Sequence, residues 1–147
     1  MNQEKAFEEL AERFENEFIL LGATAVEDRL QDMVPETIYD LIRANIKVWM
    51  LTGDKLETAQ NIAKSCKLIM PDMTVIRQDK TSLQSVLIEM ERNMKIYNKC
   101  VENNMRRAFL VTGDSLALTL DNPKLCNDFI DIAMNCDSVI CCRVTPK

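Results

Sequence analysis

The sequence contains no histidine, and none of its six cysteines forms a Cys-x-x-Cys pair. Protein zinc sites are built mainly from these two residue types at short spacings, so the sequence does not favour a zinc site. The cysteines fall within predicted helices and a strand, and Cys141 and Cys142 are adjacent. We therefore expect buried, reduced thiols and no metal ligands.

Long apolar runs and an excess of positive charge are also lacking. No stretch approaches the roughly 20 apolar residues of a membrane span, and the acidic N-terminal stretch does not resemble a signal peptide. Lys plus Arg is 18 and Asp plus Glu is 23, which gives a net charge of −5. This charge opposes non-specific attraction to nucleic acid or anionic lipid, so we expect a soluble segment without a nucleic-acid partner. Any bound phosphate must be held by local groups.

The chain of 147 residues has the length of one domain, and 47% of it is hydrophobic. A leading amphipathic helix is predicted for residues 1–17, and strands alternate with helices over residues 18–147. The alternation predicts an α/β fold with a mostly parallel sheet and helices on both faces. The predicted strands are 18–25, 47–51, 73–77, 108–111 and 138–142, and the helices between them open near Pro35, Leu56, Leu83 and Pro123.

Polar groups follow three of the predicted strands, at 27–29, 52–54 and 143–145. Ligands of parallel α/β sheets gather at the carboxyl ends of the strands. At Thr52, Gly53 and Asp54, the glycine lets the backbone approach an anion, the threonine hydroxyl can donate to phosphate, and the next helix presents its positive end. Asp54 would repel phosphate unless it bonds ribose or loop groups, meets a magnesium shell, or caps the helix. An ordinary turn with an N-cap would also explain the tripeptide.

Two other segments imitate phosphate motifs. Thr112, Gly113 and Asp114 repeat the tripeptide after a strand, but the chain soon reaches Pro123. We interpret this repeat as a turn without a full-length helix. Asp79, Lys80 and Thr81 also follow a strand, and we expect Thr81 or Ser82 to cap the long helix from Leu83, with Asp79 in the preceding loop.

Three stretches together, LLGATAVEDRLQ, KVWMLTGDKLETAQNIAKSCKLI and VICCRVTP, closely resemble the phosphorylation domain of P-type ATPases, most of all the phospholipid-flipping subfamily. The resemblance runs from about residue 18 to residue 147. It implies a haloacid-dehalogenase-like Rossmann fold, present here in truncated form. It also implies that Thr52, Gly53 and Asp54 are the second phosphate-contacting loop of that family, and that Arg143 contacts the nucleotide, since a guanidinium can pair two phosphate oxygens. Asp28 and Arg29 match the hinge toward a nucleotide-binding domain, so the resemblance also implies a nucleotide contact at this hinge, with Arg29 facing the nucleotide; surface ion pairing would account for them as well.

The departures from the family define what we expect of this chain. The phosphorylated aspartate of the Asp-Lys-Thr-Gly-Thr motif should precede residue 1, and Asp79 comes in the wrong order to replace it. The magnesium-holding Gly-Asp-Gly-x-Asn-Asp motif should come downstream, and Lys147 follows Pro146 too closely to be the catalytic lysine. We therefore expect no catalytic residue, no metal ligand and no required cofactor in this segment, and no ATPase activity.

The resemblance implies more for the full-length parent. It would be an integral membrane protein that uses ATP and magnesium, moves a phospholipid and has a small membrane accessory subunit, and this segment would face the cytoplasm. Removal of the family's central strand should leave an exposed sheet edge and favour self-association.

Two rival interpretations stay open at this level. A receiver-like module would use Asp54 as phosphoacceptor, with Glu27 and Asp28 holding magnesium. A protein-interaction module would use the methionine-rich face of residues 90–101, although core packing also explains such a stripe.

Overall fold

Four parallel strands form the centre of the structure, a computed structural model that describes residues 3–14, 19–25 and 29–144. Their order across the sheet is β1-β4-β3-β2, so β1 and β2 are the two edge strands. In the registered pairs, Met50 lies opposite Ile140, and Leu110 lies opposite the same residue from the other side. The strands are β1 (Val48–Leu51), β2 (Thr74–Gln78), β3 (Arg107–Thr112) and β4 (Ser138–Cys142).

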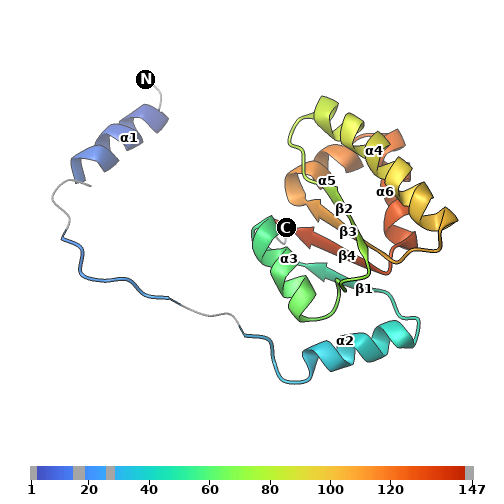
Figure 1. The fold of residues 1–147 in the computed structure, drawn as a ribbon. Coiled ribbons are helices and arrows are strands. Elements are labelled where there is room, and N and C mark those ends of the chain that lie inside the picture. The colour runs from blue at the N-terminus through green and yellow to red at the C-terminus, as the bar shows by residue number, and fades with distance from the viewer. Residues whose placement is uncertain (1–2, 15–18, 26–28, 145–147) are drawn as a thin grey trace.

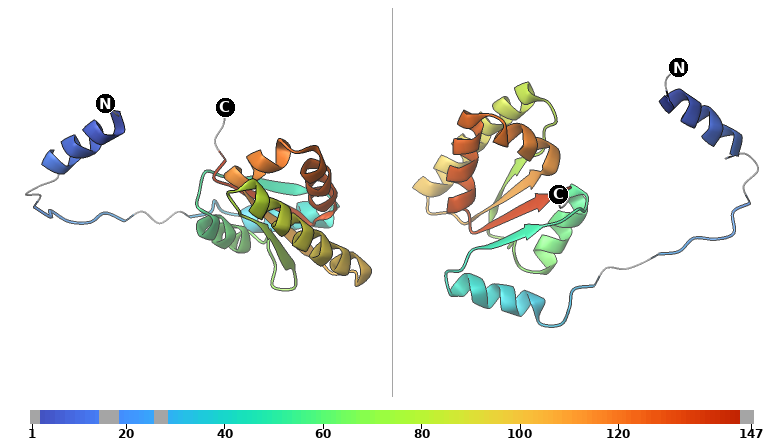
Figure 2. Two further views of the ribbon diagram at one scale, coloured as in Figure 1. Left: turned by 90° about the horizontal axis from the view of Figure 1, so that it is seen from above. Right: turned by 180° about the vertical axis from the view of Figure 1, so that it is seen from behind.

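Three helices cover one face of this sheet (Figures 1 and 2). They are α4 (Leu83–Glu102), α5 (Gly113–Leu120) and α6 (Pro123–Asn135). The core of this face contains Phe109 of β3 against Phe129 of α6, with ring centroids 5.5 Å apart. Met90 of α4 is buried in the same cluster. The methionine stripe of α4 therefore packs into the core at this position, which favours core packing over a partner surface.

Two helices, α2 (Val34–Arg43) and α3 (Leu56–Ser65), cover the opposite face. Ala59 and Ala63 of α3 are fully buried against Leu110 and Ile140 of the central strands. Small residues on α3 let the helix approach the sheet closely. The predicted α/β class, with a parallel sheet and helices on both faces, is confirmed.

The predicted strand at 18–25 is wrong. Residues 19–25, which are described, belong to no strand or helix, and Leu21 is 97% exposed. Figure 1 shows this segment running away from the sheet toward α1 (Gln3–Phe14). Its apolar composition is typical of a buried strand, but a strand also needs a neighbouring backbone with which to pair. Within the described residues, the segment has no such neighbour.

The prediction for the second Thr-Gly-Asp segment is also wrong in part. Helix α5 begins at Gly113 itself, with Thr112 as its N-cap residue, and runs for 8 residues. Because no spacer separates strand from helix, a short helix fits before Asn122 caps α6. The predicted cap of α4 is confirmed, since the Ser82 hydroxyl accepts from the backbone N–H of Ser85 at 3.4 Å.

All six cysteines are free thiols, and five of them are buried, as predicted. Cys126 departs from the prediction, since it is only partly buried. Burial raises the pKa of Cys136 to about 12 and that of Cys141 to about 11. These thiols are therefore protonated at neutral pH and behave as small apolar side chains. Among the helices that the structure describes, none is long and apolar enough to cross a bilayer.

Candidate functional site

The carboxyl ends of all four strands lie along one edge of the sheet, because the strands are parallel (Figure 1). The chain leaves β1, β2 and β4 through polar turns at residues 52–55, 79–82 and 143–144. β3 ends at Thr112 and α5 begins at Gly113, so residues 112–114 form a direct strand-to-helix junction, called here the turn after β3. We call this side of the molecule the carboxyl edge. It is where a parallel α/β sheet presents helix amino ends and free backbone groups to a ligand.

The turn after β1 is held closed by its own side chains. The Thr52 hydroxyl donates to the Asp54 carboxylate at 2.7 Å, and the Asp54 backbone N–H donates back to the Thr52 oxygen at 3.1 Å. Asp54 thus bonds a loop group, one of the roles considered for it. It does not cap α3, whose N-cap residue is Lys55 and makes no side-chain cap bond. The first N–H groups of α3 therefore remain available to an anion.

Arg143 lies directly beside this turn. Its backbone N–H donates to the Asp54 carbonyl at 3.1 Å, and the next N–H, of Val144, donates to the Thr52 carbonyl at 3.1 Å. The backbone of Arg143 is in the left-handed region at φ 54, which is uncommon for a residue with a side chain. These hydrogen bonds hold that conformation. The structure thus brings Arg143 together with Thr52 and Asp54, as the sequence predicts.

Gly113, at the start of α5, lets the end of β3 lie close against the backbone of Arg143. A Cβ atom at Gly113 would lie 2.3 Å from the Arg143 carbonyl oxygen and 3.0 Å from its carbonyl carbon. Only glycine fits against this backbone. The turns after β1 and β3 therefore enclose the turn after β4, as the strand order β1-β4-β3 requires.

A cavity of about 230 Å³ opens at this edge, lined by residues that follow β2, β3 and β4 and by the first turn of α3. Thr52, Gly53 and Asp54 are not among its lining residues. This volume is below the roughly 300–1,000 Å³ of whole small-molecule sites, so it suits part of a ligand, such as a phosphate group. Three carboxylates and one guanidinium line it, which suits a phosphate accompanied by a cation better than a bare phosphate. The lining residues are Leu56, Glu57, Asp79, Thr81, Thr112, Asp114 and Arg143.

The cavity also contains an unsatisfied polar group. Thr112 is only 7% exposed, and its hydroxyl oxygen has no hydrogen-bond partner. Such a group is a normal feature of sites that are completed by a ligand or water. The described residues include no group of three or more acidic or cysteine side chains placed to hold a metal directly. A magnesium ion here would be held partly by phosphate and water, as this ion commonly is.

Sequence reasoning missed most of this lining. Asp79, Thr81, Thr112 and Asp114 belong to the two segments that we had set aside as imitations. The available signal was their position, since each pair directly follows a parallel strand and so must reach the same edge. Glu57 carried no signal beyond its place in the first turn of α3.

Arg29, the hinge residue that the structure describes, does not line the cavity. Asp28 and its neighbour Glu27 lie outside the described residues, and so does Thr145. Arg29 is described, is exposed and precedes α2 in a segment that belongs to no strand or helix.

No protein-family model matches the chain. Curated proteins do match, over nearly all of its length. Mouse phospholipid-transporting ATPase IC is 36% identical over 99% of this chain, and the DRS2 phospholipid-transporting ATPase of Saccharomyces cerevisiae is 38% identical over 99%. A phospholipid-transporting ATPase of Schizosaccharomyces pombe is 48% identical over 92%.

The chain belongs to the phospholipid-transporting ATPase family. It spans only part of these relatives, namely 15% of the mouse protein and 11% of each yeast protein. The shared segment is therefore a small part of a phospholipid-transporting ATPase, and this part contains the four-stranded sheet and its carboxyl edge. The family resemblance read from the three sequence stretches is confirmed.

Proposed function

We propose that this chain is part of the phosphorylation domain of an ATP-driven phospholipid translocase, and that its carboxyl edge contacts phosphate. Thr52, Gly53 and Asp54 would form the phosphate-contacting loop, and Arg143 would contact the nucleotide. The observation that supports this best is the pair of backbone hydrogen bonds from residues 143 and 144 to the carbonyls of Asp54 and Thr52. They place a guanidinium-bearing residue beside the amino end of α3.

The chain's own groups would act by binding and orienting. The amino end of α3 and the Arg143 guanidinium supply positive charge, and Gly53, with no atom nearer than 3.9 Å to a Cβ built on it, leaves room for close approach. The Thr52 hydroxyl, which donates to Asp54 in the structure, keeps that carboxylate turned into the loop. Bound magnesium would supply charge neutralisation to the phosphates in the parent. Asp28 and Arg29 remain proposed hinge residues.

A binding experiment tests the phosphate contact. The 147-residue chain would be titrated with the magnesium complex of AMP-PNP, a non-hydrolysable ATP analogue, and compared with Arg143→Gln. Arg43→Gln is the matched control, because Arg43 is exposed in the last turn of α2, which leads to the opposite end of β1. We expect weak binding that is lost in Arg143→Gln and kept in Arg43→Gln. Equal binding by both variants would contradict the assignment of Arg143.

We further propose that this chain alone does not hydrolyse ATP. The sequence contains no Asp-Lys-Thr-Gly-Thr or Gly-Asp-Gly-x-Asn-Asp motif, and Lys147 is too close to Pro146 to match the catalytic lysine. Positioning, metal and lysine each contribute orders of magnitude to phosphoryl transfer. An assay with γ-labelled ATP should give no release of phosphate above the buffer rate. Turnover that scales with protein concentration would overturn this proposal.

The outer edge of β1 supports the proposal that this chain associates with itself. Among the residues that the structure places, β1 pairs only with β4, and two of its apolar side chains, Trp49 and Leu51, are 41% and 67% exposed. An open strand with apolar side chains is a template for pairing. Light scattering should give a mass that rises with concentration and falls in Leu51→Lys, whereas Ile130→Lys, an exposed apolar site on α6, should leave it unchanged. A monodisperse monomer at all concentrations would contradict this.

For the full-length parent we propose the remaining properties of the family. It would be an integral membrane protein that uses ATP and magnesium to move a phospholipid, with a small membrane accessory subunit, and the segment described here would face the cytoplasm. The names of the curated relatives support phospholipid transport. Expression of the parent in lipid-flux assays, with Arg143→Gln as the inactive variant, would test this.

A further inference from the structure

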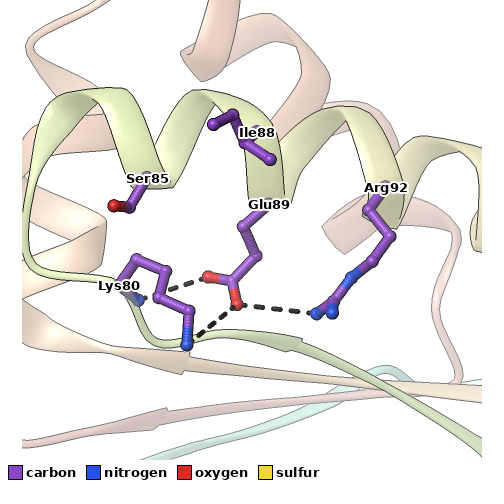
Figure 3. A pocket seen from close by; sticks show the side chains of 5 residues that line it. All are labelled: Lys80, Ser85, Ile88, Glu89 and Arg92. Atoms are coloured by element: carbon purple, nitrogen blue, oxygen red, sulfur yellow. Dashed lines mark hydrogen bonds and ion pairs between the residues drawn. The ribbon is translucent and has the colours of Figure 1, made fainter.

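Glu89 on α4 is the one acidic residue that is buried among those the structure describes, with 5% of the residue exposed. A buried carboxylate is unfavourable unless hydrogen bonds and opposite charges compensate it. Figure 3 shows how this is achieved, because the carboxylate points from α4 toward the turn that precedes the helix. The position of Glu89 is therefore determined by that turn.

Both oxygens of the Glu89 carboxylate are used. Oε2 accepts from the backbone N–H of Asp79 at 2.8 Å and from that of Lys80 at 3.2 Å. Oε1 lies 3.9 Å from the ammonium group of Lys80 and 3.6 Å from the guanidinium of Arg92 (Figure 3). Two charge-assisted hydrogen bonds to consecutive amides fix the course of the backbone, since the amides must both point at one oxygen.

Lys80 strengthens the same connection. Its ammonium group donates to the Asp79 carboxylate at 2.9 Å. This hydrogen bond, together with the attraction of Asp79 and then Glu89, raises the pKa of Lys80, so the group is charged at neutral pH. Because Lys80 is exposed, water screens these ion pairs, and the two backbone hydrogen bonds carry most of the restraint.

The strand end before this turn is also attached to α4. The Asn93 side chain donates to the Arg77 carbonyl at 2.6 Å and to the Gln78 side chain at 2.7 Å. Gln78 in turn donates to the Val86 carbonyl at 3.3 Å. The carboxyl end of β2 is thus rigidly joined to α4, and Glu89 extends the same attachment by two residues into the turn.

This attachment bears on the cavity at the carboxyl edge. Asp79 and Thr81, on either side of Lys80, line that cavity together with Arg143. We propose that Glu89 is a positioning residue for the phosphate site: it holds the turn of residues 79–81 so that Asp79 and Thr81 face the ligand. This inference rests on the proposed function of the carboxyl edge. It gives a role to α4, outside the stretches that carry the family resemblance.

The test compares Glu89→Gln with Glu91→Gln in the 147-residue chain. Glutamine has the shape of glutamate but no charge, and Glu91 is exposed on the same helix, so the second variant controls for the charge change. Two quantities are measured by NMR: the hydrogen-exchange rates of the Asp79 and Lys80 amides, and the affinity for magnesium AMP-PNP from the shifts of residues 52–54. Urea unfolding of both variants shows whether each remains folded.

In Glu89→Gln we expect the two amides to exchange about tenfold faster, which corresponds to replacing charge-assisted by neutral hydrogen bonds. The affinity should fall about threefold, because the turn occupies its binding conformation for less of the time. Glu91→Gln should change neither quantity. A purely structural Glu89 would lower stability and leave the affinity unchanged, and this result would overturn the inference.

A second variant guards against a general loss of structure. Lys80→Met removes the two ion pairs of Lys80, with Asp79 and Glu89, but keeps both backbone hydrogen bonds to Glu89, so it should retain slow exchange of the two amides. Fast exchange in Lys80→Met would overturn the assignment of the restraint to Glu89. If the unmodified chain binds no AMP-PNP at all, the proposed function itself fails. Binding that is equal in Glu89→Gln and Glu91→Gln refutes only the role of Glu89.

Discussion

The two Thr-Gly-Asp turns of this chain have the same three residues and different structures. In the first, Thr52 and Asp54 are bonded to each other, Gly53 is exposed, and the helix begins two residues beyond Asp54. In the second, Thr112 is buried without a partner for its hydroxyl, and the helix begins at Gly113.

The position of the parent strand explains the difference. β1 is an edge strand, so the turn that follows it has a free side. β3 lies between β4 and β2, so its turn is packed against Arg143, with no room for a Cβ at Gly113. A tripeptide therefore specifies a set of hydrogen-bonding groups, and its neighbours in the sheet decide how those groups are used. The following experiments test this comparison.

The largest effect is expected from alkaline pH, which acts on two buried cysteines in and next to β4. This strand lies between β1 and β3, the strands that lead into the two turns. Burial, as the main cause, raises the pKa of Cys136 to about 12 and that of Cys141, on β4, to about 11. Unfolded thiols ionise near pH 9, so the folded state retains more protons between pH 9 and 12 and loses stability as pH rises. We expect a loss on the order of 2–4 kcal/mol between pH 9 and 11 under reducing conditions.

Urea unfolding at several pH values measures this loss. Cys136→Ala should flatten the pH dependence, while Cys126→Ala, at a partly exposed site, should not. The same slope in all three proteins would show that these thiols are not the cause.

The next largest effect is expected from alanine substitutions at Gly113 and Gly53, which should differ in how much they lower stability. Alanine at 113 forces its Cβ against the Arg143 carbonyl, and we expect a loss of about 1–3 kcal/mol in the free energy of unfolding. Alanine at 53 meets only the Val144 carbonyl, at 3.9 Å, so a change within about 0.5 kcal/mol is expected. Urea unfolding of the two variants compares them directly. Similar losses at both positions would contradict the contrast between an open and a closed turn.

Valine substitutions at Thr52 and Thr112 should affect stability differently, lowering it at the first position and not at the second. Thr52→Val removes two hydrogen bonds within the first turn and should lower stability by about 1–2 kcal/mol. Thr112→Val replaces an unpaired buried hydroxyl by a methyl group of similar shape, so stability should be unchanged or higher by up to about 1 kcal/mol. Thermal unfolding without ligand measures both. A destabilised Thr112→Val would reveal a partner for that hydroxyl in solution.

Periodicity and capping predicted much of this fold, because they are local properties. The apolar face of α3, the proline at the start of α2 and the Ser82 cap of α4 could all be read from neighbouring residues. The segment at 19–25 could not, since its apolar residues do not reveal whether another strand is available for pairing.

The site was predicted in part, and for a different reason. Thr52, Asp54 and Arg143 meet because strand ends share an edge, which topology alone implies. The contributions of Asp79 and Thr112 depend on the strand order β1-β4-β3-β2, which the sequence does not state. Glu89 is one of several glutamates in α4, and a glutamate in a helix is normally expected at the surface. Its burial depends on the course of the turn that it holds, which the sequence of α4 does not reveal.

Paramagnetic broadening by the Mn²⁺ complex of AMP-PNP tests most directly whether the carboxyl edge binds phosphate. Mn²⁺ replaces magnesium on the phosphates and broadens the NMR signals of nearby amides. We predict broadening of the amides of Thr52, Gly53, Asp54 and Arg143, with the amides of Val48 and Ser138, at the amino ends of β1 and β4, left sharp. Broadening centred on Val48 and Ser138, or none at either edge, would contradict the account.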